Sequence, residues 1–444
     1  MEQKDNLKEN RETFSSMVGF ILSCIGSAIG IGSIWLFPYR LGEYGGATFL
    51  FIYILFVIVV GFSGVIGEIA FGRATKSGPI GAFKKAVESR TGKSWGKYLG
   101  MIPVLGALCM GIGYSVVVGW ILKYLIRALI KISIYQDTSE YFINVSSGNK
   151  NFFYHIFALI ITFIIILGGV SKGIEKANKI MMPIFFALFL FLAVWIFFLP
   201  NSNAGYLYLF KPNWSLLKDF KMWAVALGQA FFSLSLAGSG TIIYGSYLRK
   251  SENIVSCAKN ISIYTLIASI LSAMVVIPAV FAYNLQGDIS CGPPLLFITM
   301  PMVFGNMPMG WFAEIVFFTA VLFAAVTSLI NLFEVPVEAV KTQFNLSRKA
   351  SIAIIFIVSI IVGILIEDGN LLGNWMNFLS VYIVPIGALM AGIMFFWVYG
   401  KNFAREEVQL GYKKPLGKWF EPMTRYVFIG VTFMVFILGL LGQL

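Results

Sequence analysis

Charged side chains are scarce in this sequence, and that scarcity excludes a soluble protein. Asp, Glu, Lys and Arg make up 12% of its 444 residues, whereas 58% of the residues are hydrophobic. Soluble domains carry about twice that charged fraction. Many apolar stretches approach the roughly 20 residues that a helix needs to cross a bilayer. Runs such as Phe157–Gly168 do not alternate as barrel strands would, so we expect a helical membrane protein.

Histidine and cysteine are nearly absent. The chain has a single histidine, His155, which excludes a multi-histidine metal site. A membrane enzyme would typically need a catalytic cluster of His with Asp or Cys, and a lone histidine does not supply one. We expect a structural or interfacial role for it. The cysteines are scattered, without the paired spacing of a metal site or a disulfide framework. They are Cys24, Cys109, Cys257 and Cys291.

The net charge of +12 follows the topology of the chain. Basic residues gather in alternate connections, such as 73–97 and 401–425, while the connections 136–150 and 366–374 are poorer in them. This is the positive-inside pattern of a multi-pass protein. It predicts the cell inner (plasma) membrane as location, a cytoplasmic N-terminus and no nucleic-acid partner.

The apolar stretches predict eleven transmembrane helices, an odd number that places the C-terminus on the extracytoplasmic side. We expect the spans near residues 16–40, 46–72, 98–130, 152–170, 178–199, 222–248, 261–285, 308–341, 350–367, 375–400 and 423–442.

Two of these spans are interrupted by small residues. The first contains Gly26–Ser33, followed by Pro38, and the sixth contains Ser233–Thr241. Small residues also allow close helix packing, so either stretch alone has a plain structural explanation. Together they begin two units of five helices that cross the membrane in opposite directions. Broken helices at matching positions of inverted halves indicate a transport site, where free amides suit a carboxylate and free carbonyls a cation.

Three motifs resemble the neurotransmitter:sodium symporter family, in its bacterial amino-acid transporter branch. They are Gly26–Gly46, Gly228–Lys250 and Ala324–Glu334. The resemblance implies an all-α integral membrane protein with the leucine-transporter-type 5+5 inverted repeat and broken helices 1 and 6. Repeat one would span about 14–200 and repeat two about 221–400, with an extra helix at about 423–442. It implies a sodium-coupled symporter, not an enzyme, which imports a small zwitterionic amino acid by alternating access.

The resemblance implies one or two sodium ions and leaves chloride open. Sodium site 2 would use Gly26, Ile29, Ala324, Thr327 and Ser328, with hydroxyls that hydrogen-bond to their own helix as the alternative for Thr327 and Ser328. Sodium site 1 would use Ala28, Ser33, Ser233 and Thr265, although the family has asparagine where this chain has Ser33. The chloride constellation would be Tyr53, Gln229, Ser233 and Ser269, with ordinary interhelical hydrogen bonds as the alternative.

The same resemblance outlines the substrate site. It implies Ala28, Ile31, Gly32, Met110, Tyr114, Phe232, Ser233, Ser235, Gly238, Ser328, Asn331 and Leu332. Gly30 stands where monoamine transporters carry an aspartate, which favours an amino acid that brings its own carboxylate. Gly238 replaces an aromatic residue and predicts a wider pocket. Asn331 would present a polar group to a larger or polar side chain of the substrate. The alternative is that it forms an interhelical hydrogen bond.

The resemblance places the gates at Arg11, Phe14, Leu36, Tyr247 and Asn377. Leu36 and Asn377 replace the family's outer arginine and aspartate. Because both partners are replaced, no unpaired charge is left at the outer gate. We therefore expect this gate to close by apolar packing and hydrogen bonds. On the cytoplasmic side Thr342 stands where the family has an acid, with Glu338 one turn away.

Alternatives to sodium coupling remain at this point. We expect the intramembrane carboxylates of Glu68 and Glu334 to be structural supports, but Glu334 keeps open a transporter of the same fold driven by protons or by exchange. A membrane-embedded enzyme is a further alternative, and a channel would need a continuous polar helix face. The sequence leaves the particular amino acid open, as well as whether the protein is a monomer or a dimer.

Overall fold

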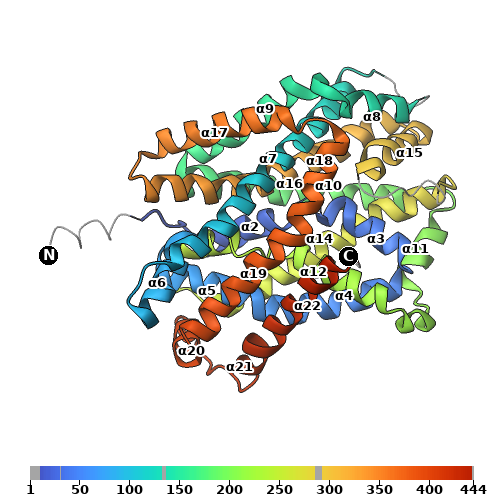
Figure 1. Cartoon of the computed structure of the whole chain (residues 1–444). Helices are drawn as coiled ribbons and strands as arrows, with labels where there is room; N and C mark the ends of the chain where they lie inside the picture. Colours follow the sequence, from blue (N-terminus) through green and yellow to red (C-terminus); the bar gives the residue numbers. More distant parts are fainter. Residues whose placement is uncertain (1–10, 31, 133–136, 286–292, 443–444) are drawn as a thin grey trace.

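The computed structural model describes residues 11–30, 32–132, 137–285 and 293–442. Within these ranges every regular element is a helix (Figure 1). Eight helices are long and apolar enough to cross a membrane. They are α4–α5 (Ala47–Thr75), α7 (Gly96–Leu129), α10 with the π-helical turn before it (Val170–Phe197), α14 (Ile254–Ala282), α16 (Gly310–Gln343), α17 (Arg348–Leu365), α18–α19 (Gly369–Val398) and α21–α22 (Phe420–Leu440).

The other three predicted spans are shorter or interrupted. The first is a bent pair, α2 (Met17–Ala28) and Gly32–Glu43, which turns by 61° and includes α3 (Phe37–Glu43). The fourth is α9 (Phe152–Leu167), an apolar helix of 16 residues. The sixth is split into α12 (Phe220–Ser233) and α13 (Gly240–Ser246).

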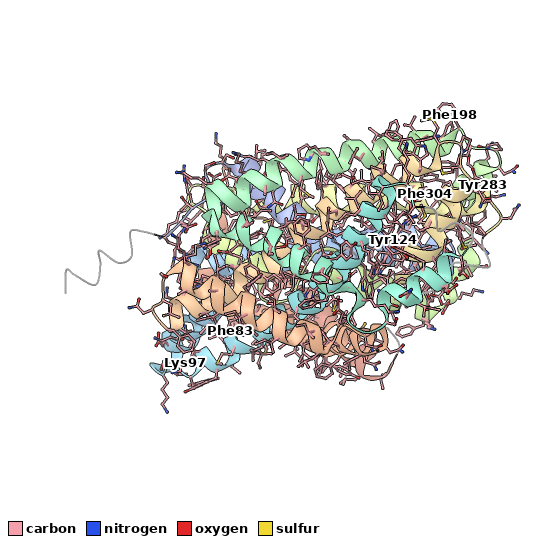
Figure 2. The ribbon with its side chains drawn as sticks, turned by 90° about the horizontal axis from the view of Figure 1, so that it is seen from above. Phe83, Lys97, Tyr124, Phe198, Tyr283 and Phe304 are labelled. Atoms are coloured by element: carbon pink, nitrogen blue, oxygen red, sulfur yellow. The ribbon has the colours of Figure 1, made fainter. Side chains whose placement is uncertain are left out.

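Short helices occupy the connections. They are α6 (Pro79–Thr91), α8 (Thr138–Ser146), α11 (Ser202–Phe210), α15 (Met300–Asn306) and α20 (Lys401–Gln409). In Figure 1, α6 and α20 lie at the left end of the molecule and α8, α11 and α15 at the right end. Figure 2 likewise shows Phe83 and Lys97 at one end, and Phe198 and Tyr283 toward the other.

Polar side chains begin many of the helices. Ser16 accepts a hydrogen bond from the Gly19 amide at the start of α2, and Asp219 accepts one from the Lys221 amide at the start of α12. Asn253, Ser347 and Asp368 cap α14, α17 and α18 in the same way. Such caps satisfy amides that a helix start leaves without partners.

The two interrupted spans occupy the centre of the bundle. The 34-residue helices α7 and α16 pack along each other, α2 packs on α10 and α16, and α12 and α13 pack on α4 and α5. Helices α17 and α10 are less buried: about a third or less of the residues in the most apolar stretch of each helix is buried inside the protein. Their exposed leucines, isoleucines and phenylalanines therefore suit contact with lipid.

Candidate functional site

Both central spans lose their helical backbone at the predicted positions. Helix α2 ends at Ala28, and the chain resumes as a π-helical turn at Gly32–Leu36. Between α12 and α13, Ser235 and Gly238 adopt left-handed conformations with φ of 56° and 66°. A left-handed residue ends a helix. The breaks therefore leave amides and carbonyls free to meet a ligand.

The carboxylate of Glu68 supports the second break. Glu68 lies in α5 (Ile66–Thr75), is 2% exposed and accepts a hydrogen bond of 2.8 Å from the Gly238 amide. Arg73, a basic residue of the same helix, forms a 2.7 Å ion pair with Glu407 instead. Glu68 thus holds the loop between α12 and α13.

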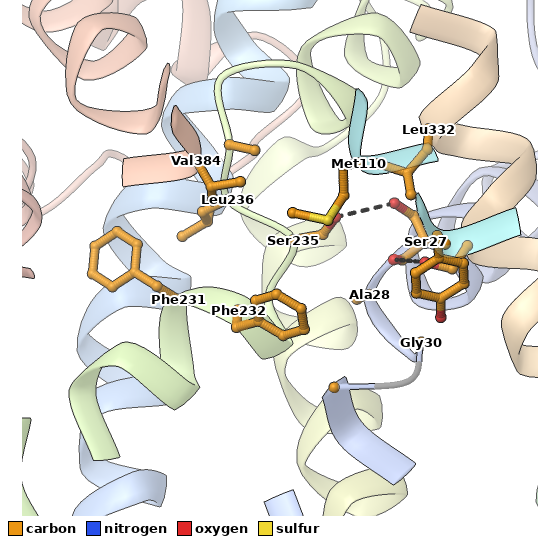
Figure 3. Close-up of a pocket in the computed structure, with 14 residues that line it drawn as sticks. Ser27, Ala28, Gly30, Met110, Phe231, Phe232, Ser235, Leu236, Leu332 and Val384 are labelled. Carbon is orange, nitrogen blue, oxygen red and sulfur yellow. Dashed lines mark hydrogen bonds between the residues drawn. The ribbon is translucent and has the colours of Figure 1, made fainter. Parts of the chain in front are cut away.

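A cavity of about 70 Å³ lies between the two breaks (Figure 3). It is lined by Ser27, Ala28, Gly30, Gly32, Met110, Tyr114, Phe231, Phe232, Ser235, Leu236, Ala237, Ser328, Leu332 and Val384. Hydroxyl groups gather on one side, where Ser27 Oγ and Ser235 Oγ are 3.3 Å apart and Ser328 Oγ donates to the Ser27 carbonyl over 3.1 Å. The remaining wall is mostly apolar.

Eight of the expected substrate residues line this cavity. They are Ala28, Gly32, Met110, Tyr114, Phe232, Ser235, Ser328 and Leu332. Ile31 lies outside the described residues. The sequence did not single out the side chains of Ser27, Leu236 and Val384. Ser27 belongs to the small-residue stretch of the first span, whereas nothing in the local pattern marks Val384.

Three expected lining residues are placed elsewhere. The Ser233 hydroxyl accepts a 3.0 Å hydrogen bond from Gln229. Gly238 packs against the carbonyl of Gly387, so its missing side chain does not widen the cavity. The amide of Asn331 donates to the Gly240 carbonyl over 3.3 Å. Asn331 thus forms the interhelical hydrogen bond that the sequence offered as one of its two roles.

Oxygen atoms of α2 and α16 converge beside the cavity. Thr327 Oγ1 lies 3.2 Å from the Gly26 carbonyl oxygen and 3.0 Å from the carbonyl oxygens of both Phe323 and Ala324 in its own helix. Thr327 is fully buried. Ile29, another residue expected at sodium site 2, directly follows the last residue of α2. Its ψ angle is 77°, which lies outside the helical range. Neutral oxygens in a dry site suit a hard monovalent cation, since a divalent ion usually recruits carboxylates.

The residues expected at sodium site 1 are also buried. Ser33 Oγ and Thr265 Oγ1 have no hydrogen-bond partner among the described residues, although both side chains are 0% exposed. Buried hydroxyls without partners are costly. These two oxygens therefore remain available to a cation or a water molecule, whereas Ser233 already has Gln229 as its partner.

The expected chloride residues form two hydrogen-bonded pairs. Tyr53 Oη and Ser269 Oγ are 3.0 Å apart, and Gln229 Nε2 donates to Ser233 Oγ over 3.0 Å. All four side chains are fully buried. The Gln229 amide is oriented by Arg40, whose guanidinium donates to Gln229 Oε1 over 3.2 Å and thereby directs the amide N–H groups inward.

A larger cavity of about 450 Å³ lies on the other side of Phe232 and Tyr114, which line both cavities. Leu36 and Asn377, the residues expected at the outer gate, both line it, and Arg40 lines it one helical turn beyond Leu36. Phe232 and Tyr114, together with Gly32, Phe231 and Val384, thus form the wall that the inner cavity shares with this vestibule.

On the opposite side, polar side chains tie the N-terminal segment to the bundle. Arg11 donates to Glu338 Oε1 over 3.0 Å, and Thr342 donates to the same carboxylate over 3.1 Å. Phe14 is 3% exposed and packs edge-on against Tyr247. Arg11 therefore has an acidic partner, one turn from the position at which the family carries its acid.

Glu334 is the centre of a second buried contact at this end. Its carboxylate accepts a 2.8 Å hydrogen bond from Tyr247 and forms a 2.7 Å ion pair with Arg348. The side chain is 0% exposed. A guanidinium and a phenol thus hold this carboxylate in place, which favours a supporting role.

Comparisons with known proteins agree with this geometry. The model of the sodium:neurotransmitter symporter family matches residues 11–152 and 146–442. An uncharacterised sodium-dependent transporter of Bacillus subtilis is 34% identical over 355 residues, which cover 78% of this chain and 77% of the relative. Another, from Methanocaldococcus jannaschii, is 31% identical over 436 residues, which cover 93% and 87%.

A solved structure shows the same fold. The crystal structure of MhsT in complex with L-phenylalanine superposes with a TM-score of 0.86 at 30% identity, covering 96% of this chain and 99% of MhsT. The prediction of an all-helical, leucine-transporter-type membrane protein with a broken first span is confirmed.

Proposed function

The chain belongs to the sodium:neurotransmitter symporter family, and on that basis we propose that it imports a hydrophobic amino acid together with sodium by alternating access. Members of this family are sodium-dependent transporters and not enzymes. The observation that carries the proposal is the approach of Thr327 Oγ1 to the carbonyl oxygens of Gly26 and Ala324 at the break of the first span.

The walls of the inner cavity support an amino-acid substrate. The hydroxyls of Ser27, Ser235 and Ser328 offer polar contacts to an ammonium group, while the Tyr114 hydroxyl and the Gly32 amide suit the carboxylate. The described lining holds no charged side chain. A substrate with balanced charges therefore fits better than a cation or an anion.

The remaining wall favours an apolar substrate side chain. Met110, Leu332, Leu236 and Val384 line the cavity, and Asn331 is turned toward α13. A polar substrate side chain would lose its hydrogen bonds to water here without gaining partners. MhsT, whose structure contains L-phenylalanine, binds an amino acid of this kind.

The ion sites follow from the same oxygens. We propose sodium at Gly26, Ile29, Ala324, Thr327 and Ser328 as the principal coupling site. The unpartnered hydroxyls of Ser33 and Thr265 support a second sodium ion. The buried donors around Tyr53 and Gln229 support chloride. The proposal includes the plasma membrane as location, with a cytoplasmic N-terminus and an extracytoplasmic C-terminus, in a monomer or a dimer.

A binding panel on the purified protein tests the proposal. Radiolabelled L-leucine, L-phenylalanine, L-tryptophan, L-glutamine and L-lysine are compared in sodium chloride, potassium chloride and sodium gluconate. We expect sodium-dependent binding of the hydrophobic members and weak binding of glutamine and lysine. Binding that is equal in potassium, or that responds to pH instead of sodium, contradicts sodium coupling. Loss of binding in gluconate identifies a chloride requirement.

A further inference from the structure

One buried oxygen beside the proposed sodium site has no partner. Asn178 lies in α10 and is 0% exposed. Its Nδ2 group donates to the Ile174 carbonyl over 2.8 Å, one turn back in the same span. Its Oδ1 atom has no hydrogen-bond partner in the described part of the chain. Because the Ile174 carbonyl can only accept, the amide orientation is fixed and Oδ1 points away from its own helix.

The free oxygen of Asn178 faces Gly26. A Cβ atom added to Gly26 would collide with Asn178 Oδ1 and would lie 2.8 Å from Thr327 Cβ and 3.1 Å from Thr327 Oγ1. Asn178 Oδ1 and Thr327 Oγ1 therefore flank the same point on α2. The same residue, Gly26, also carries the carbonyl oxygen that Thr327 Oγ1 approaches to within 3.2 Å.

Burial without a partner is unfavourable for an amide oxygen, at about 1–3 kcal/mol. Such an oxygen is retained where something occupies the space next to it, either water or an ion. An amide oxygen is a hard, neutral ligand of the same kind as the carbonyl and hydroxyl oxygens already gathered at Gly26 and Thr327.

We propose that Asn178 supplies an additional oxygen to the cation held at Gly26 and Thr327. The site is then closed by three spans, α2, α10 and α16, and not by α2 and α16 alone. This inference rests on the proposed sodium coupling. It gives the span Val170–Phe197 a direct part in ion binding, so the ion links the start of that span to the broken first helix.

The chain contains a matched control. Asn151 is also 0% exposed, donates through Nδ2 to a carbonyl, that of Val116, over 3.0 Å, and leaves Oδ1 without a partner. It packs beside Gly119, away from the broken spans. Within the described ranges, two buried asparagines thus leave Oδ1 without a partner, Asn151 and Asn178, and of these two it is Asn178 that lies against Gly26.

The test is a sodium titration of the full-length protein in detergent, followed by its thermal unfolding. Sodium that binds the folded state raises the unfolding temperature, and the concentration dependence reports its affinity. We expect Asn178→Leu to raise the midpoint sodium concentration by about tenfold or more, as for lost groups around other metal sites. Asn151→Leu should leave the midpoint within about twofold of the wild type. In the Thr327→Val/Ser328→Ala background, Asn178→Leu should have no further effect, because all three act on one ion.

A second variant covers the case in which Asn178→Leu does not fold. Asn178→Asp keeps an oxygen and adds a charge, so we expect sodium stabilisation to persist and a stabilising response to calcium to appear. An unchanged sodium midpoint in Asn178→Leu overturns the inference. If only Asn178→Asp folds, the absence of a calcium response in that variant overturns it. A wild type that does not respond to sodium refutes the proposed function itself, whereas a responding wild type with an indifferent Asn178 refutes only this ligand.

Discussion

Thr327 Oγ1 lies 3.2 Å from the carbonyl oxygen of Gly26. This contact joins the middle of α16 to the last turn of α2. The two residues are 301 positions apart in the chain. Their contact exists only because α2 ends at Ala28 and packs on α16. The proposed cation site is therefore a product of the tertiary fold, and each of the following predictions tests one part of the structure around it.

The first prediction concerns Gly30 at the break of the first span. A Cβ atom at Gly30 would lie 2.5 Å from Tyr114 Oη and 2.9 Å from Ser328 Oγ. We expect Gly30→Ala to weaken amino-acid binding about tenfold or more, since overpacking costs about 1–3 kcal/mol. Equilibrium binding of the panel's best amino acid measures the effect. Gly373→Ala is the control, because Gly373 lines the vestibule and has no heavy atom within 4 Å of its added Cβ. Equal binding by both variants would contradict the placement of the site.

The second prediction concerns the buried ion pair of Glu334 with Arg348. Glu334→Ala leaves the guanidinium of Arg348 with only the more distant carboxylate of Glu12, 4.0 Å away, so we expect a loss of about 3 kcal/mol in the free energy of unfolding. Thermal unfolding in detergent measures it. Lys84→Ala breaks the exposed pair with Glu88, whose side chains are 46% and 37% accessible, and should change stability by less than about 1 kcal/mol. Similar losses in both variants would argue against a supporting role for Glu334.

The third prediction concerns Glu367, in the connection between α17 and α18. Its side chain is 0% exposed, and neither carboxylate oxygen has a hydrogen-bond partner among the described residues. Burial, only partly offset by the charge of Lys123, raises the pKa of Glu367 from 4.5 to about 7. Between these values the folded protein holds a proton that the unfolded chain has released. The stability contributed by this group therefore falls as pH rises from about 4.5 to about 7 and is constant above that range.

Thermal unfolding at pH 5 and pH 8 tests this pH dependence. We expect Glu367→Gln to remove part of the destabilisation between these pH values and to be more stable than the wild type at pH 8. The difference should be on the order of 1 kcal/mol for each pH unit of the shift. Glu140→Gln, at an exposed position of α8, is the control and should follow the wild type. If Glu367→Gln has the same pH profile as the wild type, the carboxyl is ionised in the folded protein.

The fold was largely predictable because its signals are local. Apolar length predicts the spans, and the stretches Gly26–Ser33 and Ser233–Thr241 predict the two breaks. The structure confirms both breaks. The sequence did not separate out the apolar segment Leu295–Asn306, which forms a short helix between α14 and α16.

The site was less predictable because side-chain directions depend on packing. Asn331 lies on the same helix as Ser328, yet its amide points to the Gly240 carbonyl because the loop before α13 approaches there. Gly238 is directed toward Gly387 by its left-handed backbone. The sequence did offer Glu338, one turn from Thr342, as a substitute acid on the cytoplasmic side, and Arg11 donates to its carboxylate over 3.0 Å.

The sodium dependence of amino-acid binding in the wild type and in Thr327→Val/Ser328→Ala tests sodium coupling most directly. Valine matches threonine in shape but removes the oxygen that lies 3.2 Å from the Gly26 carbonyl. The wild type should bind the amino acid in sodium and not in potassium, and the variant should fold but need at least about tenfold more sodium. Equal binding in sodium and potassium by the wild type, or an unchanged sodium midpoint in the folded variant, would contradict sodium binding at this site.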